Sequence, residues 1–458
     1  MGWSHARLMM AAAFAALSTC GGGAAPIDSG DGGTAPILSA GAKLGAKIFE
    51  DKALSVSGRQ SCATCHVAAY AFAADPSSDG PDRGLPVPLG GPSMDEPGFR
   101  NAPSLMYASF APAFYFDAEG NPNGGFFRDG RAATLADQAM KPFITSFEMA
   151  NPDAASVIER LKGRPYFAEF TALYGAEVLN DPNTALQRMG QALAAFETES
   201  VDFHPFASKY DYWLKGEATL TTQEQRGLGL FNNPTKGNCA ACHPSTGDGV
   251  TPPLFTDFSF DNLGLPRNHN IPGNNPASAP AYTPINSNDG IETYYDLGIC
   301  GPLRDDGTLN LSGICGQFKV PTLRNIARTA PYFHNGQFPT LSKAIGFYVR
   351  RDTNPEQFYP TAADGSVTKF SDLPSLYGGQ FVVNINLPGS DAGYLGNINT
   401  GEIPYNRVLG DQPALDAEEI DDLIAFLCTL TDGYDPENPT APMLPAQCQS
   451  AAAAASSP

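Results

Sequence analysis

Apolar residues recur at helical spacing in two segments of the chain. Residues 185–199 form the first, and its apolar positions are Leu186, Met189, Leu193 and Phe196. The second begins at Asp416, a good helix N-cap whose partner three residues later is Glu419. We find no convincing strand-like alternation, and the Pro-, Asn- and Gly-rich segment 244–315 and much of 351–412 should be long loops. The pattern predicts a mainly α protein.

Three blocks of sequence occur twice, in the same order. Each first copy and its repeat are 45–49 and 227–231, 102–105 and 320–323, and 127–135 and 333–341. Such a match is hard to produce by chance, so we interpret the chain as two related domains fused near residues 205–220. We assign residues 41–212 to the N-terminal domain, 213–435 to the C-terminal domain and 436–458 to a tail.

Composition and charge narrow the range of partners. The chain has 458 residues, of which 42% are hydrophobic and 17% charged, which suits a globular protein of two or three domains. Its formal net charge of −20 argues against nucleic acid or an anionic membrane surface as a partner. A basic redox protein would be attracted to such a surface.

The N-terminus has the features of a bacterial export signal. Its apolar run, residues 8–17, is too short to span a bilayer. Cys20 then closes a sequence that resembles a lipoprotein cleavage box, although Thr19 replaces the usual small residue. We assign residues 1–20 to the signal and 21–40 to a flexible linker. Two outcomes stay open, a lipid anchor at Cys20 in the outer membrane or ordinary cleavage nearby, and both place the protein in the periplasm.

Two CxxCH sequences, one in each repeat, carry the strongest chemical signal. Their residues are Cys62, Cys65 and His66 in the first copy and Cys239, Cys242 and His243 in the second. CxxCH attaches c-type haem: both thiols bond the haem vinyl groups, and the histidine is placed to ligate the iron. A zinc site would need cysteine pairs about 15–20 residues apart, and a thioredoxin-like CxxC would need a βαβ unit. Neither is present, so we expect two covalently bound haem c groups.

Four cysteines remain once Cys20 and the CxxCH motifs are set aside. In an oxidising compartment such an even set forms disulfides. Because each pair is close in sequence, we expect Cys300–Cys315 and Cys428–Cys448, although four cysteines allow three pairings.

The further axial ligands decide what each haem does. Iron with two strong protein ligands mainly transfers electrons, whereas an open position binds peroxide or oxygen. Outside the signal and the CxxCH motifs the histidines are His204, His269 and His334, and none lies in the loop 67–100 after the first motif.

Tyr348 is a candidate ligand of the second haem. It lies eight residues after Thr340, and its counterpart in the first repeat, eight residues after Thr134, is Pro142. If this position faces iron, the second haem gains a phenolate ligand and the first gains none. On spacing alone, a core tyrosine on a helix over 340–350 remains the simpler interpretation.

Several stretches together resemble the bacterial di-haem cytochrome c peroxidase and MauG family. The resemblance covers residues 44–432, and its most specific stretches are 318–325, 329–336, 100–105, 129–131 and 147–149. It implies two fused cytochrome c-like haem domains with long loops. It also implies that the N-terminal haem reacts with hydrogen peroxide, that the C-terminal haem relays electrons, and that a small redox protein or a protein substrate supplies them.

The resemblance also assigns roles to individual residues. His66 and His243 would be the proximal iron ligands. Glu148 would be the distal acid and base that removes a peroxide proton and returns it to the leaving oxygen, with Gln138 and Pro142 lining the same pocket. Read without the resemblance, Glu148 is one acid near a helix end.

The family further binds calcium between the haems. By motif, the Asn101 side chain and the carbonyls of Thr329 and Pro331 would hold it, and oxygen ligands suit Ca²⁺. The alternative for Asn101 is a turn residue before Ala-Pro.

Three departures from the family pattern matter. The first haem lacks the removable loop histidine of the peroxidases, so it should be open at rest; Met94 is the alternative ligand, although a loop methionine is more often packing. Tyr348 stands where many peroxidases have methionine, as it does in MauG. Arg128 stands where the family usually has a tryptophan between the haems, and Phe127 is much harder to oxidise than tryptophan.

Three hypotheses follow. The first is a MauG-like enzyme of the Tyr-ligated branch, whose second haem shares oxidising equivalents with the first. The second is a conventional cytochrome c peroxidase that reduces hydrogen peroxide with electrons from a small cytochrome or cupredoxin. The third is a non-catalytic di-haem electron-transfer protein, which would have no reason to keep Gln138, Pro142 and Glu148 together.

Overall fold

Helices and irregular loops make up most of the computed structural model. The structure describes residues 37–77, 79–274, 296–301, 303–304, 314–367, 369–373, 376–377, 380–381, 398–399, 407–438 and 447–448. All of them fall within one compact unit. The predicted signal, the Cys20 site and most of the predicted linker lie outside these ranges. Among the described residues, no helix is long and apolar enough to cross a membrane.

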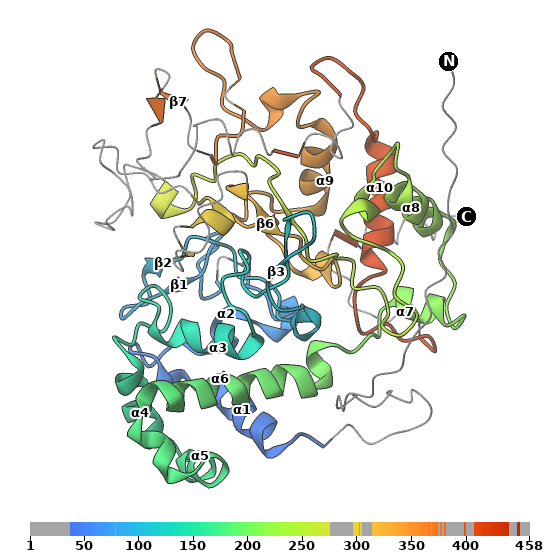
Figure 1. Ribbon diagram of the computed structural model, residues 1–458. Coiled ribbons are helices and arrows are strands. Elements are labelled where there is room, and N and C mark those ends of the chain that lie inside the picture. The colour runs from blue at the N-terminus through green and yellow to red at the C-terminus, as the bar shows by residue number, and fades with distance from the viewer. Residues whose placement is uncertain are drawn as a thin grey trace, which may run out of the picture. The chain divides into compact units, whose positions relative to one another are not determined.

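In the N-terminal half, one long helix, α6, packs across its neighbours (Figure 1). The helices are α1 (Ala40–Glu50), α2 (Cys62–Cys65), α3 (Leu135–Ile144), α4 (Ala154–Lys162), α5 (Phe167–Tyr174) and α6 (Pro182–Glu199). The predicted helix over 185–199 is α6, and it starts earlier because Asp181 caps it and Pro182 suits its first turn. At Gly45 a Cβ would lie 2.0 Å from the Ala192 carbonyl oxygen, so glycine allows α1 to cross α6 closely.

The C-terminal half repeats this crossing with α8 and α10 (Figure 1). Its helices are α7 (Lys209–Leu214), α8 (Thr222–Asn232), α9 (Leu341–Arg350) and α10 (Ala417–Cys428). The predicted capping box of Asp416 and Glu419 begins α10. At Gly227 a Cβ would lie 2.0 Å from the Asp422 carbonyl oxygen. Gly45 and Gly227 occupy the same place in the first repeated block, so the duplicated sequence makes the same helix contact twice.

The strands are all two residues long and form isolated antiparallel pairs. They are β1 (Leu89–Gly90) with β2 (Glu96–Pro97), β3 (Tyr115–Phe116) with β4 (Pro122–Asn123), β5 (Phe260–Asp261) with β6 (Phe318–Lys319), and β7 (Leu376–Tyr377) with β8 (Gln380–Phe381). Short 3₁₀ turns cover Lys52–Leu54, Ala68–Tyr70, Ala108–Phe110, Ala176–Asn180, Val201–Phe203, Cys239–Ala241, Pro272–Asn274, Gly298–Cys300, Ile326–Arg328 and Pro355–Gln357. The mainly α prediction is confirmed, and the described parts of the two predicted loops contain only such short elements.

Each half has its own apolar cluster. The larger two draw on residues between 44 and 203 and between 210 and 448. The boundary at 212/213 stays a prediction. Both expected disulfides are present, Cys300–Cys315 and Cys428–Cys448, and the second ties the end of α10 to the tail.

Candidate functional site

Both CxxCH motifs open onto one cavity. Its wall includes Cys65 and His66 from the first motif and Cys239, Cys242 and His243 from the second. Cys62 packs against the N-terminal apolar cluster. The four motif cysteines form no disulfide among the described residues, in contrast to the two bonded pairs. Two sets of thioether-forming groups therefore face the same space, which suits two covalently held haems.

The two histidines are held in the same way. His66 Nδ1 lies 2.9 Å from the Phe72 carbonyl oxygen, and His243 Nδ1 lies 2.8 Å from the Phe255 carbonyl oxygen. Burial lowers the pKa of both imidazoles, so they are neutral, and a neutral ring that donates from Nδ1 keeps the lone pair of Nε2 free. This is the tautomer that an iron ligand needs, so the residues present fit haem in both halves.

The three residues predicted for peroxide chemistry all line this cavity. Gln138 and Pro142 lie one turn apart on α3, whose N-cap is Thr134, and Glu148 follows in the turn after the helix. The β1–β2 hairpin fixes that turn: Gly91 N–H donates to the Glu148 carbonyl oxygen at 2.8 Å. Next to it, a Cβ at Gly90 would lie 2.3 Å from the Phe147 carbonyl oxygen, so this contact requires glycine.

Glu148 has the electrostatics of an acid–base group. Burial raises the pKa of its carboxyl, while a hydrogen bond with Thr145 and the nearby positive charge of Arg131 act in the opposite direction. Arg131 is itself fixed, because its guanidinium pairs with Asp129 at 2.9 Å and lies 3.5 Å from the ring centroid of Phe127. Arg131 is not one of the site residues predicted from the sequence, although it lies within the repeated block 127–135.

Tyr348 lies in the second half of the site. It projects from α9 into the cavity, and its ring centroid is 5.5 Å from that of Phe333. Burial, then the neighbouring thiols of Cys242 and Cys239, raise the pKa of its phenol. Tyr348 is therefore close to the second CxxCH motif. Its counterpart in the first repeat, Pro142, lines the same cavity.

Histidine is scarce around the cavity. Among the described residues of its wall, the histidines are His66, His243 and His334. His334 Nε2 is 3.1 Å from the Asp372 carboxylate, and its ring stacks on Phe318. Met94 lies in the turn between β1 and β2, is buried, and is not among the described wall residues. Within the described wall, His334 is the one histidine outside the two CxxCH motifs, and its ring is already engaged by Asp372 and Phe318.

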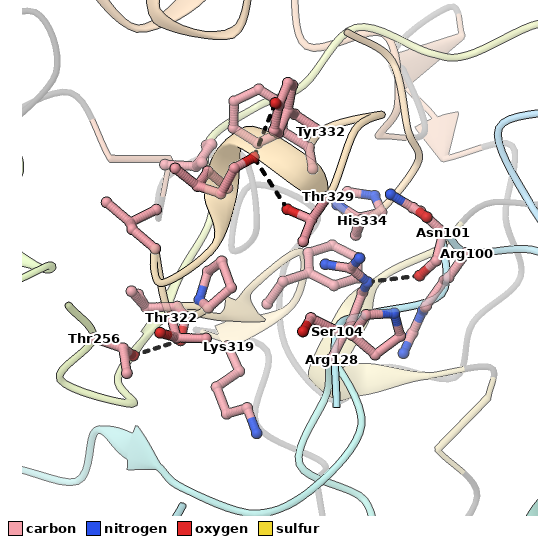
Figure 2. A pocket seen from close by; sticks show the side chains of 18 of the residues that line it. Arg100, Asn101, Ser104, Arg128, Thr256, Lys319, Thr322, Thr329, Tyr332 and His334 are labelled. Carbon is pink, nitrogen blue, oxygen red and sulfur yellow. Dashed lines mark hydrogen bonds between the residues drawn. The ribbon is translucent and has the colours of Figure 1, made fainter. Parts of the chain in front are cut away.

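Two of the predicted calcium ligands, Asn101 and Thr329, lie in the same part of the wall (Figure 2). The Asn101 side-chain amide donates to the Pro331 carbonyl, and Thr329 lines the cavity beside them. Arg128 Nε donates to the Asn101 backbone carbonyl at 2.9 Å. The oxygen donors fit Ca²⁺ in kind. A bound cation would need the Asn101 amide to turn its oxygen toward Pro331, and it would lie near the Arg128 charge.

Two half-buried cations also face the cavity. Burial and then the neighbouring Arg100 lower the pKa of Arg128 to about 10, and burial lowers the pKa of Lys319 to about 8, with Asp129 opposing the shift. Both side chains are charged at neutral pH. They are suited to pair with haem propionates, since buried charges need partners. Lys319 was missed because one lysine beside a repeated block carries no distinct signal.

Comparisons with known proteins agree with this geometry. Residues 39–219 match the family model described as di-haem cytochrome c peroxidase. The chain is 36% identical over 410 residues to methylamine utilization protein MauG of Paracoccus denitrificans, covering 88% of this chain and 91% of that protein. It is 29% identical over 316 residues to cytochrome c peroxidase Ccp of Escherichia coli, covering 68% of this chain and 54% of that one.

A solved structure shows the same fold. The diheme peroxidase BthA from Burkholderia thailandensis superposes with a TM-score of 0.70 at 34% identity, covering 87% of this chain and 88% of that chain. Fold, paired CxxCH motifs and sequence similarity over most of the length agree. The chain belongs to the di-haem cytochrome c peroxidase and MauG family, whose members are peroxidase-type oxidoreductases with two haem c groups.

Proposed function

We propose that this protein is an exported, MauG-like oxidoreductase that reacts with hydrogen peroxide at its N-terminal haem without prior reduction. The observation that carries the proposal is the contrast between the two halves of the cavity. The N-terminal half contributes His66 and Pro142 to the cavity wall, and Pro142 cannot ligate iron. The C-terminal half contributes His243 and Tyr348. An open position in one half and a phenol in the other match a site built for peroxide beside a second site that shares oxidising equivalents.

In the first site, the bound haem iron would supply the electrons that break the peroxide O–O bond. Glu148 removes a proton from one peroxide oxygen and returns it to the other, which then leaves as water. Its raised pKa suits both steps, because the group must accept and donate a proton at similar pH. The Gln138 amide orients the peroxide by hydrogen bonding, and Pro142 keeps the adjacent wall apolar.

In the second site, Tyr348 would ligate iron as a phenolate, and binding would release the phenol proton. The negative charge of the phenolate favours oxidised iron and lowers the reduction potential of this haem. Electrons would finally come from a small redox protein or a protein substrate in the periplasm. The acidic surface favours a basic partner. We also propose one Ca²⁺ held by Asn101, Thr329 and Pro331 between the haems.

Replacing Tyr348 tests the proposal. In Tyr348→Phe we expect the absorption spectrum of the second haem to change and its reduction potential to rise. The matched control is Tyr332→Phe, which alters another tyrosine of the wall whose hydroxyl donates to the Ile326 carbonyl at 3.0 Å. An unchanged spectrum in Tyr348→Phe would contradict the proposed ligand. Rapid steady-state turnover with reduced cytochrome c would instead favour a conventional cytochrome c peroxidase.

A further inference from the structure

A buried tyrosine links the cavity to a carboxylate in the other half of the chain. Tyr107 is 2% exposed and lines the cavity. Its hydroxyl donates to Asp432 Oδ2 at 2.8 Å. Asp432 lies just after α10, so the contact joins segments 325 residues apart. A phenol that borders a redox site and donates to a carboxylate has a proton acceptor in place.

The internal repeat shows that the two halves differ at the position of this tyrosine. Counting from the repeated blocks at 102–105 and 320–323, Tyr107 corresponds to Asn325. Both residues have left-handed backbones, with φ of 61° and 59°, and both side chains reach the same oxygen, since Asn325 Nδ2 lies 2.6 Å from Asp432 Oδ2. Asparagine is favoured in this conformation and tyrosine is not. The N-terminal half therefore keeps a phenol where the shared backbone favours an amide.

The surroundings of the pair favour movement of a proton from phenol to carboxylate. Burial raises the pKa of Tyr107, so the phenol is protonated at rest, and burial raises the pKa of Asp432, which makes its carboxylate a stronger base. The Ala207 N–H donates to the other carboxylate oxygen at 3.0 Å and holds it in place. The Arg324 guanidinium lies 4.8 Å from the Tyr107 ring centroid, and its charge is matched by Asp211.

No other described phenol of the cavity wall has this arrangement. The tyrosines of the wall are Tyr107, Tyr332 and Tyr348. Tyr332 donates to the Ile326 backbone carbonyl, which is a poor proton acceptor (Figure 2). Tyr348 is the proposed iron ligand. The described wall contains no tryptophan.

We propose that Tyr107 is an internal electron donor to the haem pair and that Asp432 accepts its proton. The inference rests on the proposed function, since hydrogen peroxide is the oxidant. Breaking the O–O bond of one peroxide takes two electrons, which the haem pair would supply, and it releases one water by the proton transfer assigned to Glu148. The haem pair would then be two electrons short. Tyr107 returns one electron, its O–H bond breaks, and the proton moves to Asp432 Oδ2. The product is a neutral tyrosyl radical that an external donor later reduces.

The test is electron paramagnetic resonance of the ferric holoprotein, frozen after one equivalent of hydrogen peroxide is added without a donor. The absorption spectrum of each sample is recorded first to confirm that the haems have reacted. We expect an organic radical signal whose hyperfine structure narrows when the protein contains ring-deuterated tyrosine. The variants are Tyr107→Phe, Tyr107→Asn, Asp432→Asn and the control Tyr332→Phe. Tyr107→Asn introduces the residue of the other repeat, which suits this backbone conformation, and the haem absorption recorded first checks that the variant is folded.

The signal should vanish in both Tyr107 variants, persist in Tyr332→Phe, and form at least about 100-fold more slowly in Asp432→Asn, because its proton acceptor is gone. A full signal in Tyr107→Phe and Tyr107→Asn would overturn the inference. So would a wild-type protein whose haems react but which forms no tyrosyl radical, and that result would leave the proposed function standing. Haems that do not react at all would contradict both.

Discussion

Replacing Glu148 with glutamine should slow the reaction with peroxide without unfolding the protein. Glutamine has nearly the same shape, so the turn held by Gly91 should keep its structure. What is lost is a group that can carry the peroxide proton. General acid–base catalysis contributes about 10²- to 10⁴-fold to a rate, which corresponds to roughly 3–5 kcal/mol of barrier.

The pH dependence gives this prediction a second readout. Glu148 must be ionised to accept the first proton, and burial raises the pKa of its carboxyl above the ordinary value. The second-order rate constant of the wild type should therefore fall as the pH drops through that raised pKa and level off above it. Glu148→Gln should lose this dependence, because the titrating group has been removed.

Stopped-flow absorption of the ferric holoprotein mixed with hydrogen peroxide measures the rate constant directly. Glu197→Gln is the matched control, since Glu197 is also a buried acid of the N-terminal half but is not among the described wall residues. It should react at the wild-type rate. A loss smaller than about tenfold in Glu148→Gln, or an equal loss in both variants, would refute the role assigned to Glu148.

Further predictions concern stability and metal binding. Burial raises the pKa of Glu197 to about 8, so the folded protein holds this proton more tightly than the unfolded chain. The protein should therefore lose stability as the pH rises from about 4.5 to 8. In urea unfolding, Glu197→Gln should remove this loss, which is worth roughly 3 kcal/mol at pH 7. Asp211→Asn should lower the free energy of unfolding by about 3–5 kcal/mol, because it leaves the buried Arg324 unpaired, and an unchanged urea midpoint would contradict this. Elemental analysis should find one Ca²⁺ per chain, and metal-free protein would refute the Asn101 site. The affinity for Ca²⁺ should rise about tenfold in Arg128→Gln, because a nearby positive charge is removed.

Helix caps and helical spacing could be predicted from the sequence, because they depend on residues that are close together along the chain. The capping box at Asp416 and the helix containing Leu193 follow from residues within a turn of one another. The disulfide Cys428–Cys448 was favoured because a short separation makes pairing simple. The duplicated blocks can be recognised by comparing the two halves of the sequence. Gly227 gives a physical reason for one of them, because both halves contain the same close helix crossing.

The wall of the cavity could not be read from the sequence, because contacts distant along the chain build it. Lys319 lies in a stretch that carries the family resemblance, yet that stretch does not indicate that the lysine lies half-buried near Arg128. Likewise the pairing of Tyr107 with Asp432 depends on how the two halves pack. Spacing alone favours a core role for Tyr348, and its proposed ligand role depends on its place in a cavity with His243.

The most direct measurement is the absorption spectrum of the resting, fully ferric protein before and after a small excess of hydrogen peroxide, with no reductant present. If the first haem is open as proposed, the Soret band should shift rapidly, at a rate that rises with peroxide concentration. No change until one haem has been reduced would show that a sixth ligand closes the first haem at rest. That result would contradict the MauG-like mechanism and favour a conventional peroxidase.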